Sequence, residues 1–183
     1  FYPAITGEVL DKAGLRGLIG GPVSDAALPS HEDAQSALDE LDSMLKHQSP
    51  LDKVQYAIAT HSVYLCSEET LRRASELAEK RDARLHIHVS ETRKEVAECH
   101  EKTGLYPVEY LDSIDFFKPG TIGAHASWMK NNAIRMLARH EATAVHRASS
   151  NMKLACGGRL SLPAFNESGV DGRIGTDGAA SSG

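Results

Sequence analysis

The sequence predicts an α/β fold built around a parallel sheet, and two observations carry this prediction. Six short apolar segments alternate with longer stretches of helical character, which is the pattern of repeated βα units. Most of the apolar segments also end in an ionisable side chain, and the spacings of these side chains, 27, 37, 21 and 31 residues, are each close to one βα unit. The side chains are His61, His88, His125, His146 and Asp177.

The strands are predicted where short apolar runs lie between glycine, proline or charged residues. In chain order they are Arg16–Gly20, Gln55–Thr60, Arg84–Val89, Thr121–Ala126, Ala142–His146 and Val170–Gly175. In a (β/α)₈ barrel the carboxyl ends of such strands converge on the catalytic site. An open doubly wound sheet usually has a glycine-rich phosphate loop after its first strand, and Gly17-Leu-Ile-Gly-Gly-Pro22 does not supply one.

Two longer helices are predicted from capping residues and apolar spacing. Ser30–His47 opens with Ser-x-x-Asp, and Ser67–Lys80 opens with Ser-x-x-Thr; both carry apolar residues on one face. Shorter helices are predicted over Thr92–Thr103, Pro107–Phe116 and Lys130–Arg139. Glycine and proline interrupt Met152–Ser168, so this segment is predicted to be mostly loop, with room for one helix.

The composition is that of a globular protein, with 41% hydrophobic and 25% charged residues. The net charge of -5, without a basic stripe, argues against a nucleic-acid or anionic-lipid partner. No apolar run approaches the roughly 20 residues of a membrane span, and three cysteines far apart indicate neither a disulfide framework nor a Cys-x-x-Cys zinc site. We therefore expect a cytoplasmic protein that acts on a small molecule, and self-association as a homo-oligomer stays open.

The side chains at the strand ends form the set that a metal-assisted hydrolase needs to hold an ion, activate a water and move a proton. His88 is interpreted as a ligand or a catalytic group. Glu91 lies just past the same strand, where a carboxylate tuned toward neutrality relays a proton; its alternative is a cap of the next helix. Asp177 suits a hard oxygen ligand that takes a proton from bound water, or a turn residue, because Asp-Gly is a strong turn dipeptide.

Three more histidines have open roles. His125 is interpreted either as a second ligand or as the group that holds the attacking water. His61 is interpreted as a substrate contact, with a strand-end residue bonded to a neighbouring loop as the alternative. His86 shares a strand face with His88, and we interpret it as a hydrogen-bonded packing residue rather than a ligand.

Taken together, the motifs resemble the amidohydrolase superfamily, and within it the branch of 5-methylthioadenosine/S-adenosylhomocysteine deaminases and chlorohydrolases. The motifs that carry the resemblance are His61-Ser62, His88-Val-Ser-Glu91, Ala124-His125, Ser149-Ser-Asn-Met-Lys-Leu-Ala155 and Gly175-Thr-Asp-Gly178. They extend over nearly the whole chain. Each is weak alone, and the ordered set is specific.

The resemblance implies a TIM-type (β/α)₈ barrel with one divalent metal ion, zinc or alternatively iron. His88 and Asp177 would be metal ligands, and His125 would orient the hydrolytic water. Glu91 would carry a proton to the ring nitrogen, and His61 would contact the substrate. The implied reaction is hydrolytic deamination of an aminated purine-type ring, such as an adenosine derivative, with release of ammonia; the alternative is dechlorination of a triazine-like ring.

Members of the superfamily also carry a His-x-His pair at the end of the first barrel strand, and this chain has no such pair before His61. We therefore expect a partial barrel, with strands three to eight present and the first two missing, in a single domain over residues 1–183. An alternative of another class is that the chain alone is a non-catalytic fragment, because two of the four expected protein ligands are absent.

Three further positions depart from the resemblance, and at one of them, which lies outside the residues that the structure describes, Ser182-Gly183 replaces the usual asparagines. Arg147 stands where relatives usually have a small or amide residue, and Gly172-Arg173 interrupts a strand that is normally continuous and apolar. Both are expected to reshape the substrate pocket or to lower stability, and they bear on the substrate more than on the chemistry.

Overall fold

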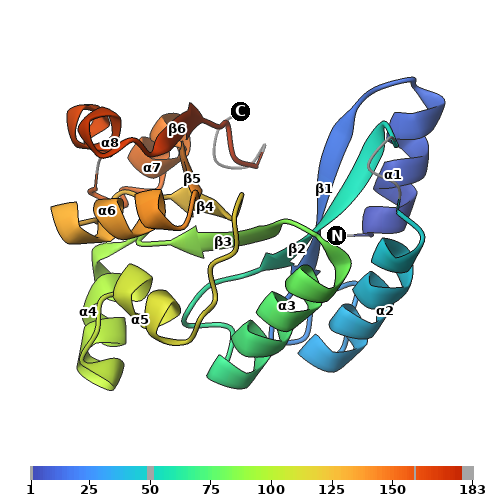
Figure 1. The fold of residues 1–183 in the computed structure, drawn as a ribbon, viewed down its shortest axis with the longest axis horizontal. Coiled ribbons are helices and arrows are strands. Elements are labelled where there is room, and N and C mark those ends of the chain that lie inside the picture. The colour runs from blue at the N-terminus through green and yellow to red at the C-terminus, as the bar shows by residue number, and fades with distance from the viewer. Residues whose placement is uncertain (1, 49–51, 159, 179–183) are drawn as a thin grey trace. The chain divides into compact units, whose positions relative to one another are not determined.

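The computed structural model describes residues 2–48, 52–158 and 160–178. The chain divides into two compact units, the first made of residues 1–61 and 65–86 and the second of residues 62–64 and 87–183. Each unit combines parallel strands with helices (Figure 1). The single domain expected over the whole chain stays a prediction. Among the described residues, no helix has the length and apolar character to cross a membrane.

The first unit contains two strands and three helices. Its elements are α1 (Pro3–Lys12), β1 (Gly17–Val23), α2 (Ala34–Lys46), β2 (Val54–Thr60) and α3 (Glu68–Arg81). The strands pair in parallel, from Gly17 opposite Val54 to Val23 opposite Thr60. Helix α1 packs on both strands, and α2 packs on both strands and on α3, beside which it runs in Figure 1. The core includes Val23, Ala37, Leu38, Leu41, Leu45, Ala57, Ile58, Leu71, Ala74 and Ala78.

The helix starts in the first unit follow their capping side chains. Helix α3 begins after Ser67, whose hydroxyl accepts a hydrogen bond from the Thr70 N–H at 3.3 Å, so the predicted cap is confirmed. Helix α2 begins after Asp33, whose carboxylate accepts from the Ser36 N–H at 2.7 Å. The predicted start at Ser30 is wrong, because the next residue, His31, makes an extended backbone bridge to Leu28 that is incompatible with a helical turn.

The sequence did not predict helix α1. The apolar side chains of this helix do not face a core: Ile5 and Val9 are 62% and 60% exposed. The buried positions of the helix are Pro3 and Gly7, and neither has the bulk that marks an apolar face. Without such a face, periodicity carries no helix signal.

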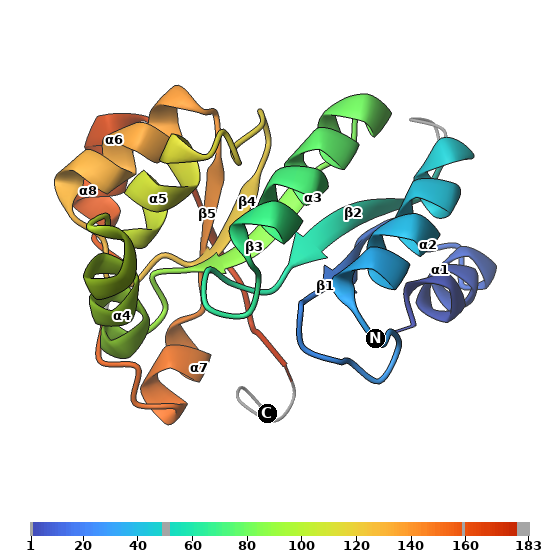
Figure 2. The ribbon, with the colours of Figure 1, turned by 90° about the horizontal axis from the view of Figure 1, so that it is seen from below.

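The second unit contains most of β3 and three further strands, which lie in the order β3-β4-β5-β6. Its elements are β3 (Leu85–Val89), α4 (Arg93–Thr103), α5 (Pro107–Ser113), β4 (Ile122–His125), α6 (Asn131–Arg139), β5 (Thr143–His146), α7 (Ala148–Lys153), α8 (Leu162–Ser168) and β6 (Asp171–Ile174). β4 pairs with β5 and β5 with β6 in parallel. Helices α4, α5, α6 and α8 pack as successive neighbours (Figures 1 and 2). The core includes Ile87, Val89, Leu111, Phe116, Ala124, Ile134, Leu137 and Phe165.

All six predicted strands are present, with shifts at their ends. In Met152–Ser168 the predicted helix is α8, while α7, which overlaps the start of this segment, was not predicted. β6 forms although Gly172-Arg173 interrupts its apolar pattern: all four of its residues are exposed, and the parallel pairing with β5 holds it. Its strand structure therefore rests on backbone hydrogen bonds rather than on buried side chains.

Candidate active site

Four of the five predicted site residues lie at the carboxyl ends of strands in the second unit. His88 is the second-to-last residue of β3, and Glu91 follows in the loop to α4. His125 is the last residue of β4, and Asp177 comes three residues after β6. His61 belongs to the first unit, where its N–H donates to the Val23 carbonyl at 2.9 Å; its contact with substrate stays a prediction.

The backbone at these strand ends has an uncommon conformation. His125 and Asp177 both have φ of 71°, and Ser90 and Ala126, beside the site, have φ of 52° and 51°. Residues other than glycine rarely adopt positive φ, and such conformations persist where the surrounding structure imposes them, often at functional sites. The backbone here turns sharply directly after strands β3 and β4, and this turn aims the ionisable side chains.

His125 is the most buried group of the site, with 2% of its side chain exposed. Its Nδ1 lies 2.8 Å from Asn151 Oδ1. The Asn151 amide in turn donates from Nδ2 to Ser127 Oγ at 2.6 Å, which leaves Oδ1 as the acceptor. This network assigns the proton of the neutral imidazole to Nδ1. Nε2 lies 3.6 Å from Glu91 Oε1, and the His88 and His125 ring centroids are 5.4 Å apart.

Glu91 does not cap the helix that follows it. Helix α4 is capped by a reciprocal pair in which the Thr92 hydroxyl accepts from the Glu95 N–H, and the Glu95 carboxylate accepts from the Thr92 N–H. The same carboxylate also accepts from the N–H groups of Ser90 and Glu91, each at 2.8 Å. The capping alternative for Glu91 is therefore wrong: its side chain, 17% exposed, is turned to His125.

Glu95 is buried beneath this loop, and burial raises the pKa of its carboxyl to about 7, with the three backbone N–H groups acting in the opposite direction. The thiol of Cys156 donates to Glu91 Oε1 at 3.8 Å. Burial, reinforced by the neighbouring Glu91 charge, raises the pKa of that thiol. Cys156 is therefore a neutral neighbour of Glu91 at neutral pH.

Asp177 makes long-range contacts that a simple turn residue does not make. Its Oδ1 accepts from Arg147 Nη1 at 2.7 Å and from the Gly178 N–H at 2.8 Å, and its Oδ2 accepts from the Ser150 hydroxyl at 2.6 Å. Burial raises the pKa of Asp177, but the hydrogen bonds from Ser150 and Gly178 and the charge of Arg147 outweigh it and hold the pKa below its ordinary value. Asp177 is therefore a carboxylate at neutral pH.

The donor types of this cluster suit a divalent ion, because imidazole and carboxylate are both zinc ligands. Their number does not suffice. Across the described parts of the chain, no three or more His, Cys, Asp or Glu side chains are arranged to hold a metal ion, and structural zinc takes four ligands. The predicted ligands His88 and Asp177 therefore do not form a metal centre on their own, and their metal role stays a prediction.

Sequence reasoning assigned no role to Asn151 or Ser150. Asn151 orients His125, and the Ser150 hydroxyl donates a hydrogen bond to Asp177. Both are buried, at 3% and 0% exposure. The only signal was their place in the motif Ser149–Ala155, since a contact across 26 residues has no local pattern. Cys156 carried no signal at all.

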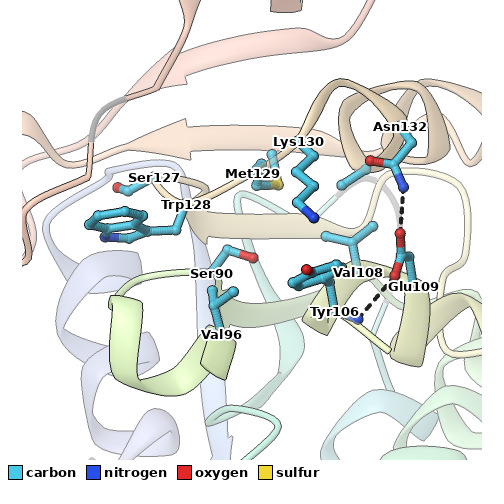
Figure 3. Close-up of a pocket in the computed structure, with 11 residues that line it drawn as sticks. Ser90, Val96, Tyr106, Val108, Glu109, Ser127, Trp128, Met129, Lys130 and Asn132 are labelled. Atoms are coloured by element: carbon cyan, nitrogen blue, oxygen red, sulfur yellow. Dashed lines mark hydrogen bonds between the residues drawn. The ribbon is translucent and has the colours of Figure 1, made fainter. Parts of the chain in front are cut away.

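A separate cavity of about 230 Å³ is lined in part by the loops that follow β3 and β4 (Figure 3). Ser90 and Ser127 line it from these loops, and Tyr106 and Lys130 line it from the starts of α5 and α6, with Lys130 Nζ 3.8 Å from the centre of the Tyr106 ring. Among the described residues that line it, none is a predicted site residue. The cavity is therefore distinct from the ionisable cluster.

The sequence pattern of the amidohydrolase family matches residues 5–183 of this chain. The chain belongs to the amidohydrolase family. Among curated amidohydrolase relatives, a 5'-deoxyadenosine deaminase of Methanothermobacter thermautotrophicus is 39% identical over 99% of this chain and 42% of its own length. A 5-methylthioadenosine/S-adenosylhomocysteine deaminase of Thermodesulfovibrio yellowstonii is 33% identical over 99% of this chain and 41% of its own length.

The fold is shared with solved amidohydrolases. The crystal structure of an adenosine deaminase from Xanthomonas campestris with bound zinc superimposes with a TM-score of 0.91 and 28% identity, over 100% of this chain and 41% of the other. The predicted α/β fold, a partial barrel of the TIM type, is confirmed. The chain spans about two fifths of the length of the relatives it matches.

Proposed function

We propose that the protein to which this chain belongs is an aminohydrolase that removes the amino group from an adenosine-type ring and releases ammonia. The observation that carries the proposal is the pair of His125 and Glu91, in which Nε2 of the buried imidazole lies 3.6 Å from the half-buried carboxylate while Asn151 holds Nδ1. The named relatives, which are deaminases of adenosine-type compounds, favour deamination over the dechlorination of a triazine-like ring.

In this proposal, different residues of the chain orient the water and transfer the protons. Hydrolytic deamination must orient a water toward the ring carbon, protonate the ring nitrogen and then protonate the leaving amine. His125, fixed by Asn151, presents Nε2 as the acceptor that orients the water. Glu91 is mostly sheltered from solvent and carries the proton first to the ring nitrogen and then to the amine. Asp177 holds its negative charge beside them.

We propose zinc as the metal of the complete site, with iron as the second candidate. His88 and Asp177 are two of its ligands in this proposal, and the others come from outside the described residues. Support comes from the donor types and from the zinc in the Xanthomonas campestris adenosine deaminase. His61 is proposed to contact the small-molecule substrate.

The proposal is tested with Glu91→Gln in the complete protein. The amide keeps the size of the side chain but cannot carry the proton, so we expect turnover to fall by a factor on the order of 10² or more. Ammonia release from 5'-deoxyadenosine and from 5-methylthioadenosine is the measurement. Glu101→Gln, at an exposed position on α4, is the matched control and should keep wild-type turnover. Near-normal turnover of Glu91→Gln would remove Glu91 from the mechanism.

A further inference from the structure

The cavity lined by Ser90, Tyr106 and Lys130 lies wholly within the second unit, and the proposed reaction gives it no role (Figure 3). Its volume is about 230 Å³. An engineered apolar cavity of about 150 Å³ holds one benzene molecule. The cavity of this chain therefore has room for a single six-membered ring that carries a small substituent.

The walls of the cavity are largely apolar. Val96 lines it from α4, Val108 from α5, and Met129 from the loop just before α6. Such walls favour an apolar ligand, because covering them removes apolar surface from water. The thioether of methionine also makes favourable contacts with aromatic rings. An aromatic ring therefore suits these walls.

Ser90 brings a buried hydroxyl to the cavity. The residue is 2% exposed, and its backbone is fixed, because its N–H donates to Glu95 and its carbonyl accepts from the N–H groups of Ser127 and Trp128. The described residues offer the hydroxyl no hydrogen-bond partner, and Figure 3 shows it directed into the cavity. A buried hydroxyl without a partner is uncommon because it costs free energy. A ligand oxygen in the cavity would supply the missing partner.

Lys130 places a positive charge at the mouth of the cavity. Lys130 and Asn132 are exposed, so the cavity opens to solvent beside them. The ammonium lies 3.8 Å from the centre of the Tyr106 ring, and no carboxylate of the described residues pairs with it. Helix α6, which begins directly after this lysine, has no side-chain cap, and the N-terminus of a helix favours an anion. The mouth therefore favours a negatively charged group.

The acidic residue of the cavity wall, Glu109, already has donors within the protein. One of its carboxylate oxygens accepts from the Tyr106 N–H at 3.0 Å, and the other accepts from the Asn132 side-chain amide (Figure 3). The polar groups left for a ligand are thus the Ser90 hydroxyl and the Lys130 ammonium, and both can donate. A ligand carboxylate accepts from both, whereas a ligand cation would meet the like charge of Lys130.

We propose that this cavity binds a small aromatic carboxylate. The ring lies between the walls formed by Val96, Val108 and Met129, and the carboxylate accepts hydrogen bonds from Lys130 and Ser90. Among the described residues that line the cavity, none is assigned a step in the proposed function, so the two proposals stand independently.

The test is calorimetric titration of the complete protein with sodium benzoate, in wild type and in variants of the cavity. Lys130→Met removes the charge and keeps much of the length of the side chain, so we expect the affinity for benzoate to fall on the order of tenfold or more. Lys130→Arg should keep most of the affinity. Ala133→Leu adds side-chain atoms at a residue that lines the cavity and should abolish binding. The matched control Lys102→Met, at an exposed position on α4, should leave the affinity unchanged.

A change of ligand tests the same site without altering the protein. Benzyl alcohol keeps the ring and lacks the charge, and acetate keeps the charge and lacks the ring; each should bind at least about tenfold more weakly than benzoate. Absence of saturable benzoate binding to wild type, or equal affinity of wild type and Lys130→Met, would overturn the inference.

Glu91→Gln separates the cavity from the proposed reaction. Benzoate binding should persist in this variant, whatever its turnover. Binding that is lost in Glu91→Gln and kept in Lys130→Met would place benzoate among the proposed reacting groups, and it would overturn the inference while leaving the proposed function intact. Low turnover of Glu91→Gln together with loss of benzoate binding in Lys130→Met would support both proposals.

Discussion

At the strand ends of the second unit, two of the ionisable side chains are held by partners that lie far away in the sequence. His125 is held by Asn151, and Asp177 by Ser150, 27 residues earlier. The sequence predicted the ionisable residues because they recur at the ends of apolar runs. It did not predict their partners, since hydrogen bonds between distant segments follow no local spacing.

Glu95 illustrates a residue-scale consequence of burial. The pKa of its carboxyl is about 7, against an ordinary value of 4.5. Between these values the folded chain binds the proton more tightly than the unfolded chain does, so the free energy of unfolding falls as pH rises through the window from about 4.5 to about 7. The contribution is on the order of 1–3 kcal/mol.

We expect Glu95→Gln to remove this contribution. Its unfolding free energy, measured by urea denaturation from pH 4.5 to pH 8, should decline less with rising pH than that of wild type, although the loss of the capping carboxylate lowers its stability at every pH. Glu101→Gln, on the exposed side of α4, should reproduce the wild-type slope. Parallel curves for Glu95→Gln and wild type would contradict a raised pKa.

At the scale of elements, the residues that cap the start of α4 also fix the loop that carries Glu91. The capping pair of Thr92 and Glu95 begins the helix, and the same glutamate accepts hydrogen bonds from the backbone N–H groups of Ser90 and Glu91. One side chain thereby caps the helix and orients the loop that carries Glu91. Capping residues are visible in a sequence as Ser, Thr, Asp or Asn before an apolar run, which explains why the start of α4 was predicted to within one residue while α1, without an apolar face, was missed.

Thr92→Ala should lower the free energy of unfolding by the contribution of this cap. Losing the hydroxyl acceptor leaves the Glu95 N–H without its side-chain partner, and such losses cost about 1 kcal/mol. Urea denaturation measures the change, with Ser43→Ala, at an exposed position on α2, as a control expected to stay within about 0.5 kcal/mol of wild type. Equal effects of the two substitutions would show that the cap does not stabilise α4.

At the scale of the whole molecule, the chain contains the residues to which the proposal assigns proton transfer, but only two of the proposed metal ligands. It spans 42% of the length of the 5'-deoxyadenosine deaminase that it matches, and its described residues contain no group of three or more potential ligands arranged for a metal. Metal affinity depends on the number and geometry of deprotonated ligands. The activity is therefore proposed for the protein to which the chain belongs.

We expect the 183-residue chain alone to release no ammonia from 5'-deoxyadenosine or 5-methylthioadenosine above the background rate, even with added zinc. The complete protein, assayed at the same concentration, should turn over at least one of the two. Zinc-dependent turnover by the isolated chain, lost in His88→Ala, would contradict this expectation and would mean that the residues present suffice.

The sequence by itself determined the strand count, most helices and the four ionisable residues of the second unit, because apolar periodicity and capping residues are local properties that folding preserves. Only the tertiary structure decided what surrounds those residues. It showed that Thr92 and Glu95, rather than Glu91, cap α4, that Asn151 sets the tautomer of His125, and that Arg147 forms an ion pair with Asp177. Each of these facts depends on which distant segments are in contact and on how exposed they are to solvent. The spacing of residues along the chain specifies neither the contacts nor the exposure.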